Sequence, residues 1–300
     1  MAKVTVGIPT FNNPAGLKRT LQCIVNQTHV DLEIIVSDNN SQTDTMRVVQ
    51  QVDDPRIICY KQPKNIGALR NFEFVLSKAT GDYFMWAADD DSWEKTYVSD
   101  LLAILVMYPN AIVAASNYKK FTEDGELKGL EQLTDTLHEL GYADIIDAVF
   151  SLKKINVATY GLFRRKELQR ILKDGFHRCD APDRILFGDV AFGDHTVVLT
   201  NEYLYSREIH RRSFAVRNGI MQSKYLGSLV VAIARGRYYA EWLKILVKNR
   251  RHGGKRYFLR RFIQYVALVE FMLLKRLPIT IFGLVPYGNR IRRVVKKCVA

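Results

Sequence analysis

The sequence predicts an α/β fold in which a doubly wound, mostly parallel sheet precedes a C-terminal helical appendage that associates with a membrane. Three observations lead to this expectation. Short apolar segments alternate with amphipathic ones over residues 3–116. One apolar segment, Tyr83–Ala88, runs directly into the carboxylates Asp89, Asp90 and Asp91. The C-terminal third is strongly basic, whereas the preceding part is weakly acidic.

Each element follows from its hydrophobic pattern. Apolar runs bounded by turn residues predict strands, at Lys3–Ile8, Leu32–Val36, Arg56–Tyr60, Tyr83–Ala88 and Ala111–Ser116. Apolar residues three and four positions apart predict helices, at Ala15–Asn26, Thr45–Val52, Ala68–Thr80, Thr96–Tyr108, Tyr142–Phe150, Arg164–Leu172, Ala181–Gly193, Tyr225–Ile233, Tyr238–Val247 and Tyr257–Leu274. A polar turn is expected around Glu123–Gly129. Strands that alternate with helices predict a parallel sheet with right-handed crossovers.

Composition narrows the class of protein. The chain is 48% apolar and 25% charged, which is ordinary for a globular protein. Its four cysteines are scattered and form no C-x-x-C pair, so we expect reduced thiols in the cytosol. The N-terminus becomes strand-like at once, without a signal-peptide core, and no run of about 18 apolar residues predicts a membrane-spanning helix.

The three carboxylates after Tyr83–Ala88 indicate a cation site. Adjacent carboxylates repel one another, and partial burial strengthens that repulsion. Mg²⁺ and Mn²⁺ prefer carboxylate and water oxygens, and open α/β sheets bind ligands beyond the carboxyl ends of their strands. The alternatives are a solvated acidic turn, or Asp91 or Ser92 capping a helix that begins near Trp93.

A dinucleotide-binding domain is disfavoured, because GIPTFNN follows the first strand in place of G-x-G-x-x-G, and no P-loop is present. The chain instead resembles the family 2 glycosyltransferases. The resemblance lies in IPTFNN, LEIIVSDNNSQTD and NIGALRNFEFVLSKATGDYFMWAADDD, which occur in the family's order over about the first two thirds of the chain. It implies a GT-A-like fold and an inverting transferase that uses a nucleotide-sugar donor.

The resemblance also implies donor-binding residues: Pro9, Thr10, Asp38, Asn65, Gly67, Arg70, Asp89 and Asp90, with Asn71 completing the N-x-G…R-N segment. Asp38 could accept a hydrogen bond from the imide of uracil, so we expect a UDP-sugar; its alternative role is an Asx-turn or a helix cap in SDNNS. Arg70 lies in the first turn of its helix, where it could reach the base or diphosphate, or be an ordinary surface arginine.

The metal ligands implied by the resemblance are Asp90 and Asp91, with Mn²⁺ or Mg²⁺ as the cofactor. Many members read D-x-D-D before the tryptophan, whereas Ala88 stands here in place of the first acid. The segment YLYSREIHRRS is similar to the family's R-x-x-H segment after the last core strand. It adds Arg207 for the diphosphate and His210 for the metal or diphosphate. Alternatively, His210 is a solvated residue of an arginine-rich loop.

Inverting transfer requires a base that takes the proton of the acceptor hydroxyl. The family's catalytic carboxylate precedes a helix in an E-D or S-D pair, and Pro182-Asp183 occupies that place. Asp183 is therefore the predicted base, with Asp180 and Asp189 as rivals by spacing. Its alternative role is to cap the helix, which would stabilise it by about 1 kcal/mol.

The charge changes abruptly near the C-terminus. Residues 1–206 carry 22 Lys and Arg against 28 Asp and Glu, whereas residues 207–300 carry 22 against 3. On Tyr257–Leu274, an apolar stripe with Lys and Arg at its ends suits a helix in the membrane interface; its members are Phe258, Phe262, Val266, Val269 and Leu273. The alternatives are helices that pack on the core or on a second subunit. No motif supports nucleic-acid binding.

Together these observations predict a catalytic domain at 1–220, with a nucleotide-sugar half (1–115) and an acceptor half (116–220), and a basic amphipathic helical region at 221–300. The expected partners are a UDP-linked donor, a glycan or lipid-linked acceptor and an anionic membrane, without nucleic acid, and with an oligomer possible through the C-terminal helices. We expect a cytoplasmic protein, peripheral on the inner face of the membrane. The competing classes are a nucleotidyltransferase and a non-catalytic membrane-associated scaffold.

Overall fold

A mixed ten-stranded sheet forms the centre of the computed structural model, which describes residues 2–151, 155–179, 181–209 and 226–274. Its order is β3-β2-β1-β4-β9-β6-β10-β5, with β7 paired to β6 and β8 to β10. The strands are β1 (Val4–Thr10), β2 (Leu32–Asp38), β3 (Ile57–Lys61), β4 (Tyr83–Trp86), β5 (Ser92–Trp93), β6 (Ala111–Thr122), β7 (Leu127–Glu131), β8 (His138–Leu140), β9 (Leu162–Arg164) and β10 (Thr196–Ile209).

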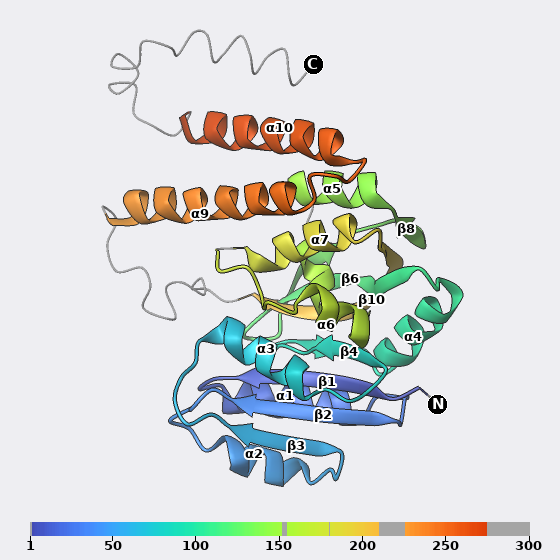
Figure 1. The fold of residues 1–300 in the computed structure, drawn as a ribbon. Helices are drawn as coiled ribbons and strands as arrows, with labels where there is room; N and C mark the ends of the chain where they lie inside the picture. Colours follow the sequence, from blue (N-terminus) through green and yellow to red (C-terminus); the bar gives the residue numbers. More distant parts are fainter. Residues whose placement is uncertain (1, 152–154, 180, 210–225, 275–300) are drawn as a thin grey trace.

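The first four strands are parallel and doubly wound, as expected. Three helices link them: α1 (Pro14–Val25), α2 (Thr45–Val52) and α3 (Ala68–Lys78). Alternate residues of the strands belong to two different apolar clusters. One contains Val6 of β1 with Leu21 of α1, and the other contains Trp86 of β4 with Val75 of α3. Both faces of the sheet are therefore buried, which is typical of parallel strands covered by helices (Figure 1).

The second half of the sheet departs from a purely parallel pattern. The three-residue strand β9 lies antiparallel between β4 and β6, and β6 runs parallel to β10. Instead of ending at Ser116, β6 continues to Thr122 and forms a hairpin with β7. The polar turn expected around Glu123–Gly129 is therefore short, and Gly125 adopts the positive φ (80°) that a tight turn of this kind requires.

Helices complete both layers: α4 (Tyr97–Met107), α5 (Tyr142–Phe150), α6 (Arg165–Ile171), α7 (Pro182–Phe192), α9 (Leu226–Lys248) and α10 (Lys255–Leu274), with a 3₁₀ helix, η1 (Ile155–Tyr160). The prediction of two separate helices at Tyr225–Ile233 and Tyr238–Val247 was wrong, because α9 is continuous through both. Gly236 lies between them, and a single glycine within a helix costs only about 1 kcal/mol.

The two C-terminal helices pack on the rest of the chain, on the side of the molecule away from β3 (Figure 1). Trp242 of α9 is fully buried against Gly188 of α7, where a Cβ atom would lie 2.3 Å from the Trp242 ring. Phe258 and Phe262 of α10 are also buried, with ring centroids 5.3 Å and 5.8 Å from that of Phe150 on α5. The helices thus share an apolar core with the sheet.

This packing corrects one expectation. The apolar stripe of α10 predicted to face lipid includes Phe258 and Phe262, and both are buried inside the protein. Leu273 lies in a part of α10 whose side chains are outside the described residues. Among the described helices, none combines the length and apolar character needed to cross a bilayer.

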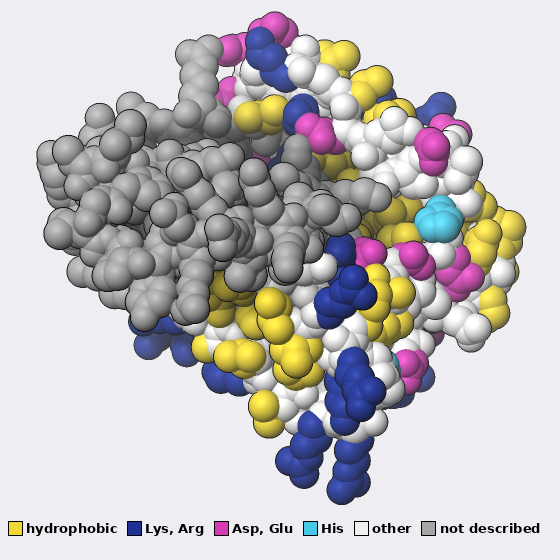
Figure 2. Space-filling view, turned by 90° about the horizontal axis from the view of Figure 1, so that it is seen from above, with side chains coloured by type: hydrophobic (Ala, Val, Ile, Leu, Met, Phe, Trp, Pro, Cys, Tyr) yellow, Lys and Arg dark blue, Asp and Glu magenta, His cyan; other side chains and the backbone are white. Residues whose placement is uncertain are grey.

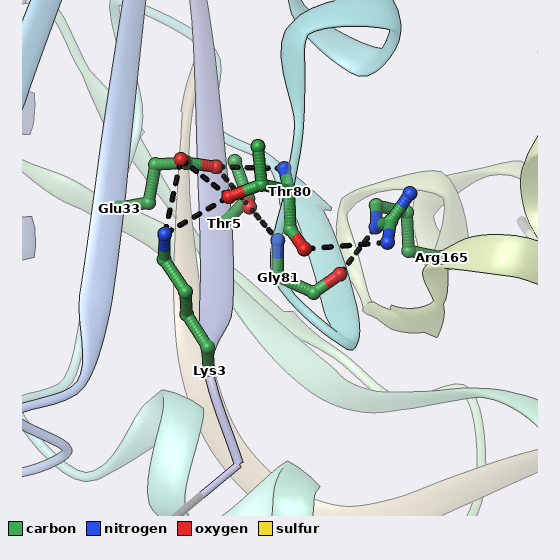
Figure 3. A network of polar contacts seen from close by, with 6 residues as sticks. All are labelled: Lys3, Thr5, Glu33, Thr80, Gly81 and Arg165. Carbon is green, nitrogen blue, oxygen red and sulfur yellow. Dashed lines mark hydrogen bonds and ion pairs between the residues drawn. The ribbon is translucent and has the colours of Figure 1, made fainter.

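A buried carboxylate joins elements at the amino-terminal edge of the sheet (Figure 3). Glu33 of β2 accepts hydrogen bonds from the Thr5 hydroxyl (2.6 Å), from the Thr80 N–H (2.8 Å) and hydroxyl (2.6 Å), and from Lys3 Nζ (3.2 Å). Arg165, at the start of α6, donates to the carbonyl of Thr80 (3.2 Å). Burial opposes ionisation of Glu33, but the hydrogen bonds from Thr5 and Thr80 outweigh it and lower its pKa.

Candidate active site

Two loops interlock at the carboxyl ends of β1 and β2. Thr10 pairs with Asp38 in the register, and the carbonyl of Thr10 accepts a hydrogen bond from the N–H of Asn39 (2.9 Å). The N–H of Asn12 donates to Ser41 Oγ (2.8 Å). This pairing brings the predicted donor-binding residues Thr10 and Asp38 side by side, with Pro9 buried one position earlier.

Asp38 is almost fully buried, and its Oδ1 accepts a hydrogen bond from the N–H of Ser41 (2.8 Å). The turn-forming role considered for Asp38 is therefore present in the structure. Asn12, Asn39 and Ser41, which also shape this edge, were not singled out from the sequence. Their only signal was the polar composition of the two loops.

The loop before α3 is held to this edge. Asn65 Oδ1 accepts hydrogen bonds from the N–H of Gly67 (2.8 Å) and from Asn39 Nδ2 (3.0 Å). Gly67 has a φ of 84°, a conformation that favours glycine, and it precedes the first turn of α3. Asn71 is buried and donates to the carbonyl of Ser37 (2.9 Å), so it anchors α3 to β2.

Arg70 differs from these neighbours. Its side chain is exposed, and among the described residues it has no hydrogen-bond or ion-pair partner. A guanidinium at this place is available to an anionic ligand lying over the loop.

The three carboxylates that follow β4 lie beside this edge. Asp89 Oδ2 accepts hydrogen bonds from the Thr10 hydroxyl (2.6 Å) and from the N–H of Phe11 (3.3 Å). Burial and the charge of Asp90 nevertheless raise the pKa of Asp89 to about 6. Asp90 is partly exposed between its two neighbours. Thr10 thus connects the end of β1 directly to the acidic cluster.

Asp91 is buried beneath the cluster. Its carboxylate accepts hydrogen bonds from the Tyr205 hydroxyl and from the N–H of Glu208 (2.8 Å), both on β10. Burial and the charge of Asp90 raise the pKa of Asp91 to about 7, against the opposing effects of these hydrogen bonds and of Arg207. Asp91 therefore ties the acidic cluster to the last core strand.

Arg207 is exposed on β10, so this part of YLYSREIHRRS lies within the last core strand rather than after it. Its charge acts on Asp91 and on the hydroxyl of Tyr160. His210 lies outside the described residues.

The predicted base, Asp183, lies in the first turn of α7. Ala181, not Asp183, occupies the cap position. Asp183 Oδ2 accepts a hydrogen bond from Asn156 Nδ2 (2.9 Å), and Oδ1 accepts one from the N–H of Arg184 (2.9 Å). These contacts hold the carboxylate on the side of α7 that meets η1.

Tyr160 lies near both Asp183 and the acidic cluster, because the charges of both act on its hydroxyl. Burial raises the pKa of Tyr160, and the negative charges of Asp91, Asp90 and Asp183 raise it further, whereas Arg207 lowers it. Charged groups from three separate segments are thus close enough to act on the Tyr160 hydroxyl. Neither Tyr160 nor Tyr205 carried a signal in the sequence, because their partners are distant along the chain.

The two rivals of Asp183 differ in position. Asp180 lies outside the described residues. Asp189 Oδ2 lies 2.9 Å from His177 Nε2, and His177 Nδ1 lies 2.8 Å from Glu241 of α9. The hydrogen bond to Asp189 is the main cause of a raised His177 pKa, which burial opposes. Asp189 is thereby engaged in joining α7 to α9.

The acidic cluster, Asp89–Asp91, offers the type of ligand that a divalent cation prefers. Within the described ranges, no three His, Cys, Asp or Glu side chains converge as a ready-made metal site. The chemistry of the cluster still fits Mg²⁺ or Mn²⁺, because it offers hard carboxylate oxygens, and the negative charge of Asp90 helps to raise the pKa of both Asp89 and Asp91.

The strands β3, β2, β1 and β4 are parallel, and the three carboxylates follow β4. The rest of the sheet contains both parallel and antiparallel strands. This arrangement defines a GT-A-like fold. The sequence model of glycosyl transferase family 2 matches residues 5–172, more than half of the chain. The chain belongs to this family.

A curated relative agrees with this assignment. The chain is 32% identical over 174 residues to GalNAc(5)-diNAcBac-PP-undecaprenol beta-1,3-glucosyltransferase of Campylobacter jejuni, which covers 55% of the chain and 54% of that relative. The chain thus spans about half the length of this relative.

Solved structures show the same fold. The chain is similar to S. aureus TarS 1–349 in complex with UDP-GlcNAc, with a TM-score of 0.68 and 15% identity over 88% of the chain and 72% of TarS 1–349. It is also similar to the mannosyltransferase PcManGT from Pyrobaculum calidifontis in complex with GDP-Man and Mn²⁺. That match has a TM-score of 0.56 and 14% identity over 99% of the chain and 84% of PcManGT.

Proposed function

We propose that this protein is an inverting glycosyltransferase that moves a sugar from a UDP-linked donor to a hydroxyl group of a lipid-linked glycan. The observation that carries the proposal is the position of the acidic cluster, Asp89–Asp91. Thr10, at the carboxyl end of β1, donates a hydrogen bond to Asp89, and Tyr205 of β10 donates one to Asp91. Membership of glycosyl transferase family 2 supports the transfer chemistry.

The donor would lie along the carboxyl ends of β1 and β2. Asp38 has one oxygen committed to Ser41, and its second oxygen would accept the uracil imide. Arg70 would approach the nucleotide from α3, in the loop conformation set by Asn65 and Gly67. TarS 1–349, whose fold the chain shares, was solved with UDP-GlcNAc, which supports a UDP-linked donor.

The diphosphate would lie over the acidic cluster. Asp90 and Asp91 would hold Mn²⁺ or Mg²⁺, which would neutralise the diphosphate as it leaves. Arg207 would stabilise the same departing charge from β10, and His210 would join it. The Mn²⁺ complex of PcManGT supports this metal proposal.

Asp183 would take the proton of the acceptor hydroxyl as the hydroxyl oxygen attacks the anomeric carbon and the bond to the nucleotide diphosphate breaks. Attack opposite the leaving group inverts the anomeric configuration. The hydrogen bond from Asn156 would orient the carboxylate for this role.

The name of the Campylobacter jejuni relative places its substrate on an undecaprenyl diphosphate, which supports a lipid-linked acceptor in glycan synthesis. The proposal includes action at the cytoplasmic leaflet.

The test is a donor screen. UDP-glucose, UDP-GlcNAc and GDP-mannose are each incubated with the protein and with Mn²⁺, Mg²⁺ or EDTA, and nucleotide release is measured with and without undecaprenyl-diphosphate-linked GlcNAc. We expect release from a UDP-sugar that requires a cation and rises with acceptor. Full turnover in EDTA would contradict the metal proposal. Release of pyrophosphate from a nucleoside triphosphate and a sugar phosphate would favour a nucleotidyltransferase, and no release under any condition would favour a scaffold.

A further inference from the structure

The outward faces of α9 and α10 each carry exposed aliphatic side chains that the buried stripe does not explain. On α9, Leu243 and Val247 are 48% and 64% exposed, and they lie four residues apart on one side of the helix. On α10, Leu259 and Ile263 are 40% and 56% exposed with the same spacing. The chain therefore buries one side of each helix and leaves aliphatic side chains on the other.

Cations border these aliphatic residues. On α10, Arg256 and Arg260 precede Leu259 and Ile263 by three positions each, so the four side chains share one face. Arg256 and Arg260 are exposed and form no ion pair within the described parts of the chain.

On α9, Arg237, Lys244 and Lys248 are exposed along one side of Leu243 and Val247. Lys244 pairs with Glu241 (2.7 Å), and Lys248 lies 4.0 Å from Asp189. Residues 226–274 contain ten Lys and Arg but only two Asp and Glu. Seen from the side of α10, the molecule shows hydrophobic side chains next to a group of Lys and Arg (Figure 2).

We infer that the outward faces of α9 and α10 dock on a membrane surface that contains anionic lipids. Aliphatic side chains at the centre of each face would enter the interface, while the Lys and Arg stems extend to the headgroups. Symmetric contact with a second copy of the same face would bring two strongly basic surfaces together, which disfavours that occupant.

The outward face of α9 is connected through α7 to the predicted base, Asp183. α9 packs on α7 through Trp242 and Gly188, and α7 carries Asp183. Docking would therefore hold the acceptor side of the site near the lipid, at a distance set by α7 and α9. This consequence rests on the proposed function, whereas the docking itself does not.

The experiment measures binding of the full-length chain to vesicles of phosphatidylcholine with phosphatidylglycerol, and to phosphatidylcholine alone, by co-flotation. No donor or acceptor is present, so failure of the proposed function would not affect the result. We expect binding to the anionic vesicles that weakens but persists at about 1 M salt, where charge is screened and apolar burial is not. The double variant Arg256→Gln/Arg260→Gln should bind about 30-fold more weakly, since each cation contributes about fivefold.

Two further double variants test whether vesicle binding depends on the outward face of α10. Leu259→Gln/Ile263→Gln should abolish the salt-resistant part of the binding. The matched control Arg47→Gln/Lys166→Gln removes two exposed cations from other helices and should leave binding within about twofold. Circular dichroism should show that all variants are folded.

Three results would overturn the inference. One is a wild-type chain that ignores anionic vesicles at low salt. Another is binding to anionic vesicles that neither α10 variant weakens, which would move the contact to another part of the chain. The third is a change from dimer to monomer in Leu259→Gln/Ile263→Gln, measured by light scattering, without vesicle binding by the wild type. That result would assign the face to a second copy.

Discussion

Replacing Asp91 with asparagine should stabilise the metal-free protein at alkaline pH. The folded chain raises the pKa of Asp91 to about 7, whereas a solvated aspartate titrates at about 3.9. The folded state therefore holds this proton more tightly than the unfolded state does. Because of this difference, the contribution of Asp91 to stability falls as the pH rises from about 4 to about 7.

The expected magnitude follows from the pKa difference. Three pKa units at about 1.4 kcal/mol each make ionised Asp91 destabilising by roughly 4 kcal/mol at about pH 8. Asparagine removes this charge but requires the Tyr205 hydroxyl to accept rather than donate, which costs about 1 kcal/mol. Asp91→Asn should therefore gain roughly 3 kcal/mol at about pH 8 and less than about 1 kcal/mol at about pH 5.

The assay is urea-induced unfolding followed by circular dichroism, in EDTA at both pH values. Asp82→Asn is the matched control, because Asp82 is an exposed aspartate and its substitution should change stability by less than about 0.5 kcal/mol. Adding Mn²⁺ at 100 times its dissociation constant should stabilise the wild type by about 2.7 kcal/mol and the variant by much less. The reasoning is refuted if Asp91→Asn in EDTA is no more stable than the wild type at about pH 8, or if its effect is the same at both pH values.

Three further predictions test other parts of the structure. Asp183→Asn should lower the rate of transfer by roughly 10²–10⁴-fold while leaving the calorimetric affinity for UDP unchanged, and normal turnover would remove Asp183 as the base. Phe258→Ala should lower the free energy of unfolding by about 3–5 kcal/mol, because Phe258 is fully buried. Leu259→Ala should change the free energy of unfolding by less than about 0.5 kcal/mol, because Leu259 is exposed. Equal effects of the two substitutions would contradict the packing of α10. Because the pKa of Glu33 is lowered, its contribution to stability is present above about pH 4.3 and is lost as the pH falls through its folded pKa. Glu33→Gln should therefore lower the melting temperature at about pH 7 but much less at about pH 3, and an effect that does not depend on pH would contradict the role assigned to the carboxylate.

The sequence by itself determined the fold class and the location of the candidate site. Both depend on local patterns: the spacing of apolar residues distinguishes strand from helix, and acids placed directly after the apolar segment Tyr83–Ala88 must lie near the carboxyl end of its strand. The motifs IPTFNN, LEIIVSDNNSQTD and NIGALRNFEFVLSKATGDYFMWAADDD, taken in order, indicated the family. The basic C-terminal third could likewise be read by counting charges.

Only the tertiary structure decided which residues share an environment. The three residues of β9 are too short to carry a periodic pattern, yet they separate β4 from β6 in the sheet. Tyr205 meets Asp91 across 114 positions of chain, and no local pattern encodes such a contact. The stripe on α10 illustrates the same limit. A row of aromatic and aliphatic residues has the same periodicity whether it meets lipid or protein, and the ring of Phe150 on α5 makes the side bearing Phe258 the buried one.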